Sequence, residues 1–232
     1  MSVFICGDTH WGYDHQKIAM KPWPEQRGLT KDDYLIVAGD FGLLWDREET
    51  KQERYFIREL QDRKFTTLFV DGNHENFDRL NDLKEIDMFG GKVGVVAEGI
   101  YHLKRGYVYI ICGKKFFCFG GALSTDKEWR IDGRSWWSDE TQTKSQEDFA
   151  YDNLEAIGWQ VDHVITHAAP ASICNQLDFV DPVRYNDPVA RFLEAVRYRI
   201  ECKSWHFGHY HDDCVMEDKF YLHYNKPPMR IV

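Results

Sequence analysis

The sequence lacks the features that mark membrane, secreted and disulfide-built proteins. It contains no apolar run near the roughly 20 residues needed to cross a bilayer, and its first residues, MSVFICGDTH, read directly into a strand rather than a secretory leader. None of its six cysteines forms a C-x-x-C pair or a zinc-finger spacing. We therefore expect a soluble protein of the reducing cytoplasm, without membrane contact and with mostly buried, inert thiols.

An excess of positive charge is also missing. The chain has 38 acidic and 29 basic residues, which gives a net charge of −9 with histidine neutral. Such a surface repels phosphate backbones at long range, so non-specific nucleic-acid binding is not expected. A local basic or metal-lined cleft remains compatible with this balance.

Internal repeats, low-complexity tracts and linkers are absent as well. The 232 residues are 43% hydrophobic and 15% aromatic, which is enough for one sizeable core. We therefore predict a single domain over residues 1–232. Long surface connections are expected at 21–28 and 124–145, and loops of that length inside a compact domain are often functional.

Runs of β-branched and aromatic residues alternate with amphipathic segments along much of the chain. Strands are predicted over Val3–Cys6, Tyr34–Ala38, Thr67–Val70, Tyr107–Cys112, Phe116–Phe119, His163–Thr166 and Trp205–Phe207, with a terminal hairpin that turns at Asp218–Lys219. Helices are predicted over Glu48–Arg63, Asn76–Lys84, Ser145–Ile157 and Pro188–Arg199. The middle, from Lys92 to Phe119, indicates locally antiparallel strands. The pattern predicts an α/β (α+β) fold, a two-sheet β-sandwich flanked by helices.

Five apolar runs end in the same way, with polar residues of the kind that bind metals or protons. The segments are VFICGDTH, LIVAGD, LFVDGNHE, HVITH and WHFGHYH. In open α/β sheets, ligand sites gather at the carboxyl ends of strands. We therefore expect one shared crevice lined by Asp8, His10, Asp40, Asn73, His74, His167, His209 and His211.

The chemistry of this set predicts a metal centre. Asp8 and His10 are two residues apart, as are His209 and His211, so each pair can face one site in extended backbone. Imidazole, carboxylate and amide ligands suit divalent manganese, iron, zinc, nickel or cobalt, of which we favour manganese. Seven such ligands are too many for one tetrahedral zinc, and they suit two ions that share a carboxylate. Two metals held close together are a standard device for phosphoester hydrolysis.

The ordered set of strand endings resembles the calcineurin-like metallophosphoesterase superfamily. Its motifs D-x-H, G-D, G-N-H-[DE], H and G-H-x-H stand here as GDTH (7–10), GD (39–40), GNHE (72–75), THAAP (166–170) and GHYH (208–211). In overall phrasing the chain is most similar to bacterial and phage-borne stand-alone phosphoesterases. The second motif continues as GDFGLLWD and lacks the Asp-Arg pair of the Ser/Thr protein phosphatases and dinucleoside-polyphosphate hydrolases. The departure argues against both of those activities.

The resemblance implies a role for each matched residue. It gives two ligand sets joined by a bridging Asp40: Asp8, His10 and His211 for one metal, and Asn73, His167 and His209 for the other. It implies that His74 protonates the leaving oxygen or stabilises charge there, and we expect Glu75 to orient His74. A hydroxide that bridges the metals would then attack phosphorus.

A long loop offers candidate substrate contacts. The segment KEWRIDGRSWW (127–137) follows FFCFGGA, which has the same strand-then-glycine pattern as the ligand segments. Arg134, Trp136 and Trp137, with Trp129 and Arg130, are the residues in question. They form either a flap over a nucleotide or other aromatic phosphoester, or a core plug whose arginines pair with Asp132 and Asp139.

These observations predict a dinuclear metal-dependent phosphoester hydrolase, either a phosphodiesterase or a phosphatase. One alternative is a metal-dependent nuclease, which would be expected to add a basic groove and stacking aromatics. The other is a non-catalytic scaffold of the same fold, which would be expected to have lost ligands. The sequence leaves the physiological substrate and the oligomeric state open.

Overall fold

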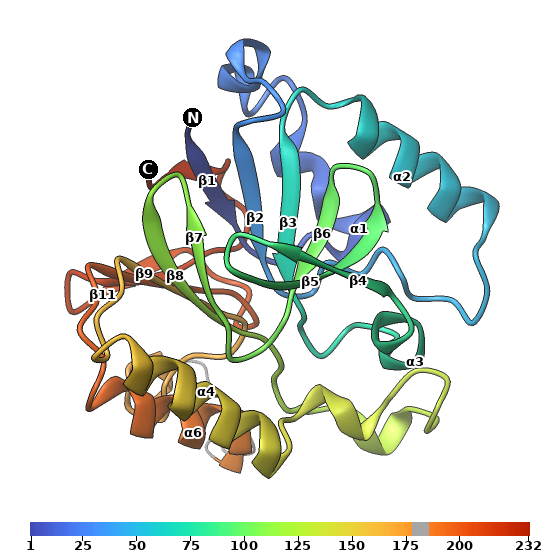
Figure 1. The fold of residues 1–232 in the computed structure, drawn as a ribbon. Helices are drawn as coiled ribbons and strands as arrows, with labels where there is room; N and C mark the ends of the chain where they lie inside the picture. The colour runs from blue at the N-terminus through green and yellow to red at the C-terminus, as the bar shows by residue number, and fades with distance from the viewer. Residues whose placement is uncertain (178–185) are drawn as a thin grey trace.

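Two β-sheets pack face to face in the computed structural model, which describes residues 1–177 and 186–232 (Figure 1). The seven-stranded sheet has the order β13-β1-β2-β3-β6-β5-β4, and the six-stranded sheet has the order β11-β12-β10-β9-β8-β7. The predicted two-sheet sandwich flanked by helices is thus confirmed. That residues 1–232 form a single domain stays a prediction.

The seven-stranded sheet is parallel in its centre. Its strands are β1 (Val3–Cys6), β2 (Tyr34–Ala38), β3 (Thr66–Val70), β4 (Lys84–Met88), β5 (Gly91–Ala97), β6 (Ile100–Leu103) and β13 (Met229–Arg230). The pairs β1–β2, β2–β3 and β3–β6 are parallel, whereas β4, β5 and β13 pair antiparallel. The central strands β1 and β3 are buried along their whole length and are rich in apolar residues, because both faces of the sheet are covered.

The six-stranded sheet repeats this arrangement. Its strands are β7 (Val108–Ile111), β8 (Lys114–Phe119), β9 (His163–Thr166), β10 (Ser204–Phe207), β11 (Cys214–Met216) and β12 (Phe220–Leu222). Strands β8, β9, β10 and β12 run parallel, and the predicted terminal hairpin is the antiparallel pair β11–β12. The expected antiparallel pairing in the middle of the chain occurs between β5 and β6 and between β7 and β8.

Alternate residues of each strand face different parts of the core. Val3 and Ile5 of β1 meet Phe116 and Cys118 of β8 between the two sheets. Phe4, between them in sequence, faces the opposite side of its sheet. The period of two residues in a strand therefore separates an inter-sheet core from two outer cores.

Helices cover the outer faces of both sheets (Figure 1). They are α1 (His10–Tyr13), α2 (Lys51–Asp62), α3 (Phe77–Asn81), α4 (Lys144–Ala156), α5 (Ala171–Cys174) and α6 (Pro188–Arg197), with 3₁₀ turns η1 (His15–Ile18), η2 (Pro24–Gly28), η3 (Lys127–Trp129) and η4 (Ser138–Glu140). Helix α2 packs on the seven-stranded sheet, and α4 and α6 pack on the other. Within residues 1–177 and 186–232, no helix is long and apolar enough to span a bilayer.

Helix boundaries differ from the sequence prediction where caps and edge strands decide them. Helix α2 begins at Lys51 rather than Glu48, because the side chain of Thr50 accepts a hydrogen bond from the backbone N–H of Glu53. Helix α3 ends at Asn81, and Lys84, predicted as its last residue, begins β4 instead. Strand β4 is an exposed edge strand, so its sequence KEIDM has no apolar run.

A buried histidine pair behind the sheets predicts acid sensitivity. His206 Nδ1 lies 2.9 Å from His223 Nε2, and burial lowers the pKa of His223 from 6.5 to about 4. Between pH 6.5 and pH 4, therefore, His223 binds a proton in the unfolded chain but not in the folded chain. We expect the titration of His223 to contribute a fall of about 3 kcal/mol in the free energy of unfolding of the metal-free protein as pH drops from 6.5 to 4, measured relative to a variant that lacks it.

Urea titrations in EDTA across this pH range measure the effect. His223→Gln keeps a polar partner for His206 but cannot titrate, so its stability should fall less steeply with pH than that of the natural protein. Parallel stability curves for the two proteins would contradict the prediction.

Candidate active site and metal centre

The candidate site lies where strands of both sheets end. Asp8 follows β1, Asp40 follows β2, and His167 follows β9. Asn73 and His74 come directly after β3, and His209 and His211 come after β10. Because the central strands are parallel, their carboxyl ends share one edge in each sheet. The two sheet edges meet there and, with His10 two residues after Asp8, eight side chains from five segments converge.

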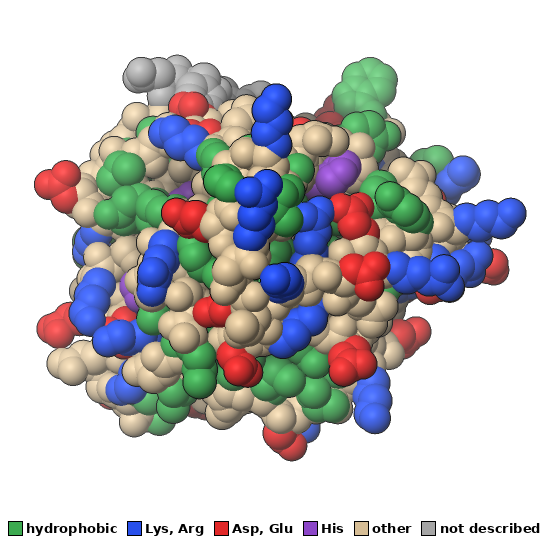
Figure 2. All heavy atoms as spheres, turned by 90° about the horizontal axis from the view of Figure 1, so that it is seen from above, with side chains coloured by type: hydrophobic (Ala, Val, Ile, Leu, Met, Phe, Trp, Pro, Cys, Tyr) green, Lys and Arg blue, Asp and Glu red, His purple; other side chains and the backbone are tan. Residues whose placement is uncertain are grey.

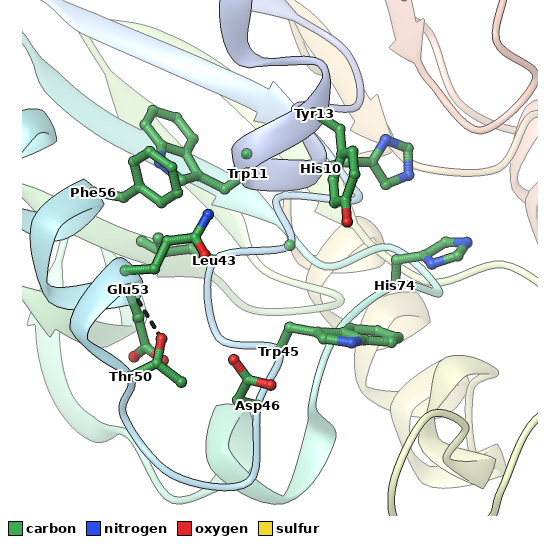
Figure 3. Close-up of a pocket in the computed structure, with 13 residues that line it drawn as sticks. His10, Trp11, Tyr13, Leu43, Trp45, Asp46, Thr50, Glu53, Phe56 and His74 are labelled. Carbon is green, nitrogen blue, oxygen red and sulfur yellow. Dashed lines mark hydrogen bonds between the residues drawn. The ribbon is translucent and has the colours of Figure 1, made fainter.

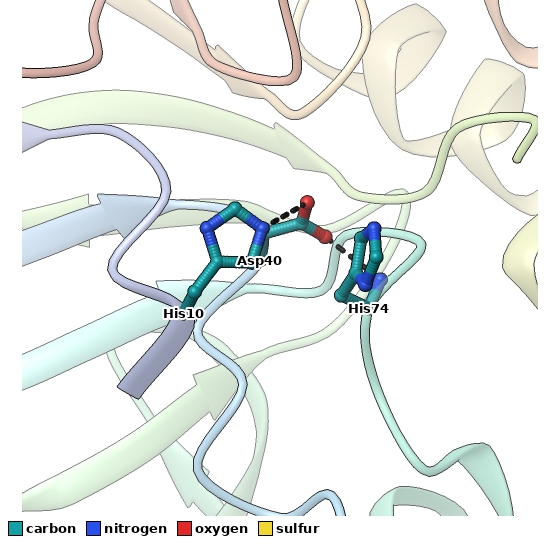
Figure 4. Close-up of side chains that lie close together, drawn as sticks. All are labelled: His10, Asp40 and His74. Carbon is teal, nitrogen blue, oxygen red and sulfur yellow. Dashed lines mark hydrogen bonds and ion pairs between the residues drawn. The ribbon is translucent and has the colours of Figure 1, made fainter. Parts of the chain in front are cut away.

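Asp40 is at the centre of this cluster (Figure 4). Its Oδ2 lies 3.1 Å from His10 Nε2, and its Oδ1 lies 3.2 Å from His167 Nε2. The backbone N–H of His74 donates to Oδ1 at 2.8 Å. The carboxylate therefore faces ligand-type side chains on two sides while the chain itself fixes its orientation.

Asp8 holds the segment that carries the last two histidines. Its Oδ2 lies 3.3 Å from His211 Nε2, and both of its oxygens accept from the backbone N–H of His209 at 3.0 Å. A Cβ on Gly208 would lie 2.1 Å from Asp8 Oδ1, so only glycine permits this approach. The GHYH segment therefore needs glycine at position 208, because a larger side chain would collide with Asp8.

The amide of Asn73 is oriented by a loop far away in sequence. Its Nδ2 donates to Ser124 Oγ at 3.1 Å, and Ser124 Oγ donates to Glu140 at 2.6 Å. This leaves the amide oxygen pointing inward, 3.2 Å from His167 Nε2. Asn73 therefore presents an oxygen, the atom that a divalent metal would use.

Groups of ligand atoms lie close enough to share a cation. Three sets have all their ligand atoms within 4.8 Å of one another: His10, Asp40 and His74; Asp40, His167 and His209; and Asp8, Asp40 and His211. Asp40 belongs to every set. The arrangement can accommodate more than one ion, with Asp40 as the common ligand.

The backbone is strained at the same residues. His10, Asp40, His209 and His211 have φ values of 32°, 44°, 69° and 52°, in the left-handed region that non-glycine residues rarely adopt. Such conformations persist where the surrounding structure enforces them, and they cluster at functional sites. Four of the seven candidate ligands share this property.

The electrostatics of the pocket favour bound cations. Burial lowers the pKa of His10, but the hydrogen bond and the charge of Asp40 outweigh it and raise the pKa to about 9. The same balance raises the pKa of His167 to about 9. The buried Asp40 has its pKa held well below its ordinary value by His167 and His10. Metal binding would replace the two imidazole protons, so the donor set fits divalent metals.

His74 lies beside the centre with a neutral ring. Burial lowers its pKa against the opposing effect of Asp40, and nearby Arg130 lowers it further. Arg130 Nη2 donates to His74 Nε2 at 2.9 Å, and its Nε pairs with Asp126 at 2.8 Å. The ring centroid of Trp45 is 5.8 Å from that of His74. The imidazole is therefore held between a guanidinium and an indole.

Residues 1–213 of the chain match the family model described as calcineurin-like phosphoesterase. The chain belongs to this family. A search of curated proteins finds no match. Among solved structures, phosphopantetheinyl hydrolase (PptH) from Mycobacterium tuberculosis aligns with 100% of this chain and 95% of its own, at 16% identity and a TM-score of 0.46. Membership makes the chain a phosphoester-hydrolysing enzyme of a family that uses divalent metals, and its ligand clusters could hold such ions.

Glu75 of this phosphoesterase contacts the loop that follows Asp40. Its carboxylate accepts from the backbone N–H of Phe41 at 2.8 Å and of Gly42 at 3.4 Å, and the expected orientation of His74 by Glu75 stays a prediction. Burial and the charge of Asp40 raise the pKa of Glu75 to about 8. The residue therefore supports the loop that follows Asp40, and it acts on the site by positioning that loop.

Of the two arginines predicted as substrate contacts, the long loop places Arg130 at the site. Arg134 is exposed, and within the described residues only its backbone forms a hydrogen bond. Arg130 reaches His74 instead, and it pairs with Asp126 rather than with Asp132 or Asp139. Arg130 directly follows η3, and its contact with His74 places this part of the loop beside the centre.

Two of the three tryptophans of this loop pack against neighbouring side chains. Trp137 is buried in the outer core, where its Nε1 donates to Asp78 at 2.9 Å. Trp136 is half-buried, with the ammonium of Lys127 3.8 Å from its ring centroid. The surroundings of Trp137 match the alternative in which the tryptophans fill the core under the loop. A role of Arg134 and Trp136 in substrate binding stays a prediction.

Sequence reasoning missed the residues that support the ligands of this phosphoesterase. Asp14 Oδ2 lies 2.8 Å from His10 Nδ1, and Ser124 and Glu140 orient Asn73. Such outer partners fix the ring or amide that binds a metal. The four-residue spacing of His10 and Asp14 was a weak signal, whereas the partner of Asn73 is 51 residues away and left none.

Proposed function

We propose that this phosphoesterase hydrolyses phosphomonoesters or phosphodiesters with two divalent metal ions that share the carboxylate of Asp40. The observation that carries the proposal is the presence of Asp40 in all three sets of ligand atoms. The proposed sets are Asp8, His10 and His211 for one ion and Asn73, His167 and His209 for the other. Manganese is the favoured metal among those that suit imidazole, carboxylate and amide ligands.

The bound metals would supply an activated water and neutralise charge on the phosphoryl group. The chain's own contribution is orientation. Asp40 is held by the N–H of His74, and Asp8 is held by the N–H of His209. Asn73 is held by Ser124. These contacts keep the ligands in place before substrate arrives, which limits the reorganisation needed during the reaction.

His74 is the proposed proton donor to the leaving oxygen. Its ring is neutral in the free protein, and an anionic phosphoryl group beside it would favour the protonated form. Arg130 now donates to His74 Nε2, and its guanidinium is suited to phosphoryl oxygens, which it can bind bidentately. Arg130 is therefore the proposed phosphate contact of the long loop.

A nuclease is less well supported than a hydrolase of small phosphoesters. The net charge of −9 does not favour polynucleotide binding, and on the one face seen in Figure 2 lysine and arginine side chains are interspersed with acidic and hydrophobic ones. A groove that tracks a polynucleotide would gather positive charge along one path. The scaffold alternative is disfavoured because every motif ligand and His74 are retained.

Metal analysis combined with turnover tests the proposal. Protein reconstituted with manganese should carry close to two ions per chain and hydrolyse esters from a panel of phosphomonoesters, phosphodiesters, cyclic nucleotides and single-stranded nucleic acid. EDTA should remove both the metal and the activity, and manganese should restore them. At most one ion after reconstitution with manganese, nickel or zinc would overturn the dinuclear centre.

A further inference from the structure

A cleft of about 640 Å³ opens beside the proposed metal centre (Figure 3). His10 and His74 line it at the centre's side, and the other walls come from α1, from the loop after β2 and from α2. The cleft is therefore continuous with the place where a phosphoryl group would bind. If His74 protonates the leaving oxygen, the leaving group would lie beside His74, in this cleft.

Four aromatic side chains, Trp11, Tyr13, Trp45 and Phe56, line the cleft among glycine and polar residues. Trp11 and Phe56 meet edge to face with ring centroids 5.5 Å apart. Trp45 is half-buried, and in Figure 3 its indole lies across the cleft from the hydroxyl of Tyr13. The side chain of Tyr13 is 85% exposed, although a tyrosine usually buries much of its ring. The cleft thus offers flat apolar faces that the fold leaves uncovered.

The charge of the cleft disfavours leaving groups that carry additional negative charge. Within the described residues its lining contains no lysine or arginine, and its acidic residues are Asp46 and Glu53. Glu53 is buried and paired with Arg79 through contacts of 2.6 and 2.7 Å, so its charge is compensated. Asp46 is exposed, and its carboxylate forms no ion pair with another described residue, although, after the hydrogen bond to Glu53, its charge also raises the pKa of nearby Arg79. Additional phosphates on a leaving group would meet this negative charge.

We infer that this cleft is the leaving-group subsite, and that the substrate is a phosphoester of a planar aromatic alcohol that is uncharged or cationic. The inference rests on the proposed hydrolase function and specifies its substrate class. Water would form the new P–O bond, the bond between phosphorus and the aryl or arylmethyl oxygen would break, and that oxygen would leave with a proton. The free alcohol would remain between Tyr13 and Trp45. Polynucleotides and nucleoside polyphosphates are disfavoured.

A matched substrate series tests the cleft with manganese-reconstituted protein. Phenyl and naphthyl phosphates, and the corresponding methyl aryl diesters, have leaving groups of similar acidity but different flat area. The naphthyl esters should have a kcat/KM higher by roughly five- to tenfold, from stacking on aromatic walls. A naphthyl ester with an aminomethyl group should gain roughly another two- to fivefold from Asp46, and a sulfonated one should lose as much.

Variants link these preferences to the cleft. Tyr13→Ala, at an exposed side chain, and Trp45→Leu should each reduce the naphthyl preference, and Asp46→Asn should remove the aminomethyl advantage. Tyr198→Ala is the matched control, because Tyr198 is 78% exposed and does not line the cleft. It should leave all of the ratios unchanged.

Binding of naphthylmethylphosphonate, followed by tryptophan fluorescence, tests the aromatic subsite independently of the proposed hydrolase activity. It should bind more tightly than methylphosphonate, and Tyr13→Ala should weaken only the naphthyl compound. Equal kcat/KM for phenyl and naphthyl esters, unchanged by the variants, would overturn the subsite and leave the hydrolase standing. Absence of turnover on every ester would overturn the proposed function, and phosphonate binding would still decide whether the cleft accepts an aromatic group.

Discussion

Asp40→Asn is expected to remove both metals and with them the activity. The substitution keeps an oxygen that can accept from the N–H of His74, but it removes the charge that faces His10 and His167. Affinity for both ions should fall by more than the roughly 10–100-fold that is typical of losing an outer-shell partner. Elemental analysis after dialysis, together with turnover at saturating manganese, measures the effect.

Asp87→Asn provides the control for this charge change. Its side chain is 89% exposed on β4, so the same substitution there should leave metal content and kcat unchanged. A variant at Asp40 that keeps two ions and a kcat near that of the natural protein would show that another residue joins the metals. Loss of a single ion would show that Asp40 belongs to one site.

His74→Ala is expected to leave the metals in place and to slow the chemistry. Only the backbone N–H of His74 contacts Asp40, and alanine retains it. Loss of a general acid lowers kcat by roughly 10²–10⁴-fold. The loss should be greatest for substrates with poor leaving groups and small for a nitrophenyl ester, whose oxygen leaves without a proton.

Metal content decides between this role and ligation, because the His74 ring also lies within reach of the set formed with His10 and Asp40. A variant that loses metal but retains its rate per bound ion would make His74 a ligand. Added imidazole should restore part of the rate if the ring acts as a proton donor.

The sequence alone determined the strands and the ligands. Runs rich in apolar residues predicted β1, β2 and β9 to the residue, because strands that are buried along nearly their whole length favour apolar side chains. The polar residues that follow them could be assigned to one crevice because the carboxyl ends of parallel strands share an edge. The order of residues within each short segment was therefore sufficient to predict both the strands and the shared crevice.

Tertiary structure decided what surrounds those ligands. Glu75 accepts a hydrogen bond from the loop after Asp40, and Arg130, one of the two candidate arginines, reaches His74. Neither outcome is visible in spacing, since each depends on how a loop without regular structure folds back over a distant strand. The partner of Asn73 and the aromatic cleft beside His74 arise in the same way, because they join segments that only the packing of two sheets brings together.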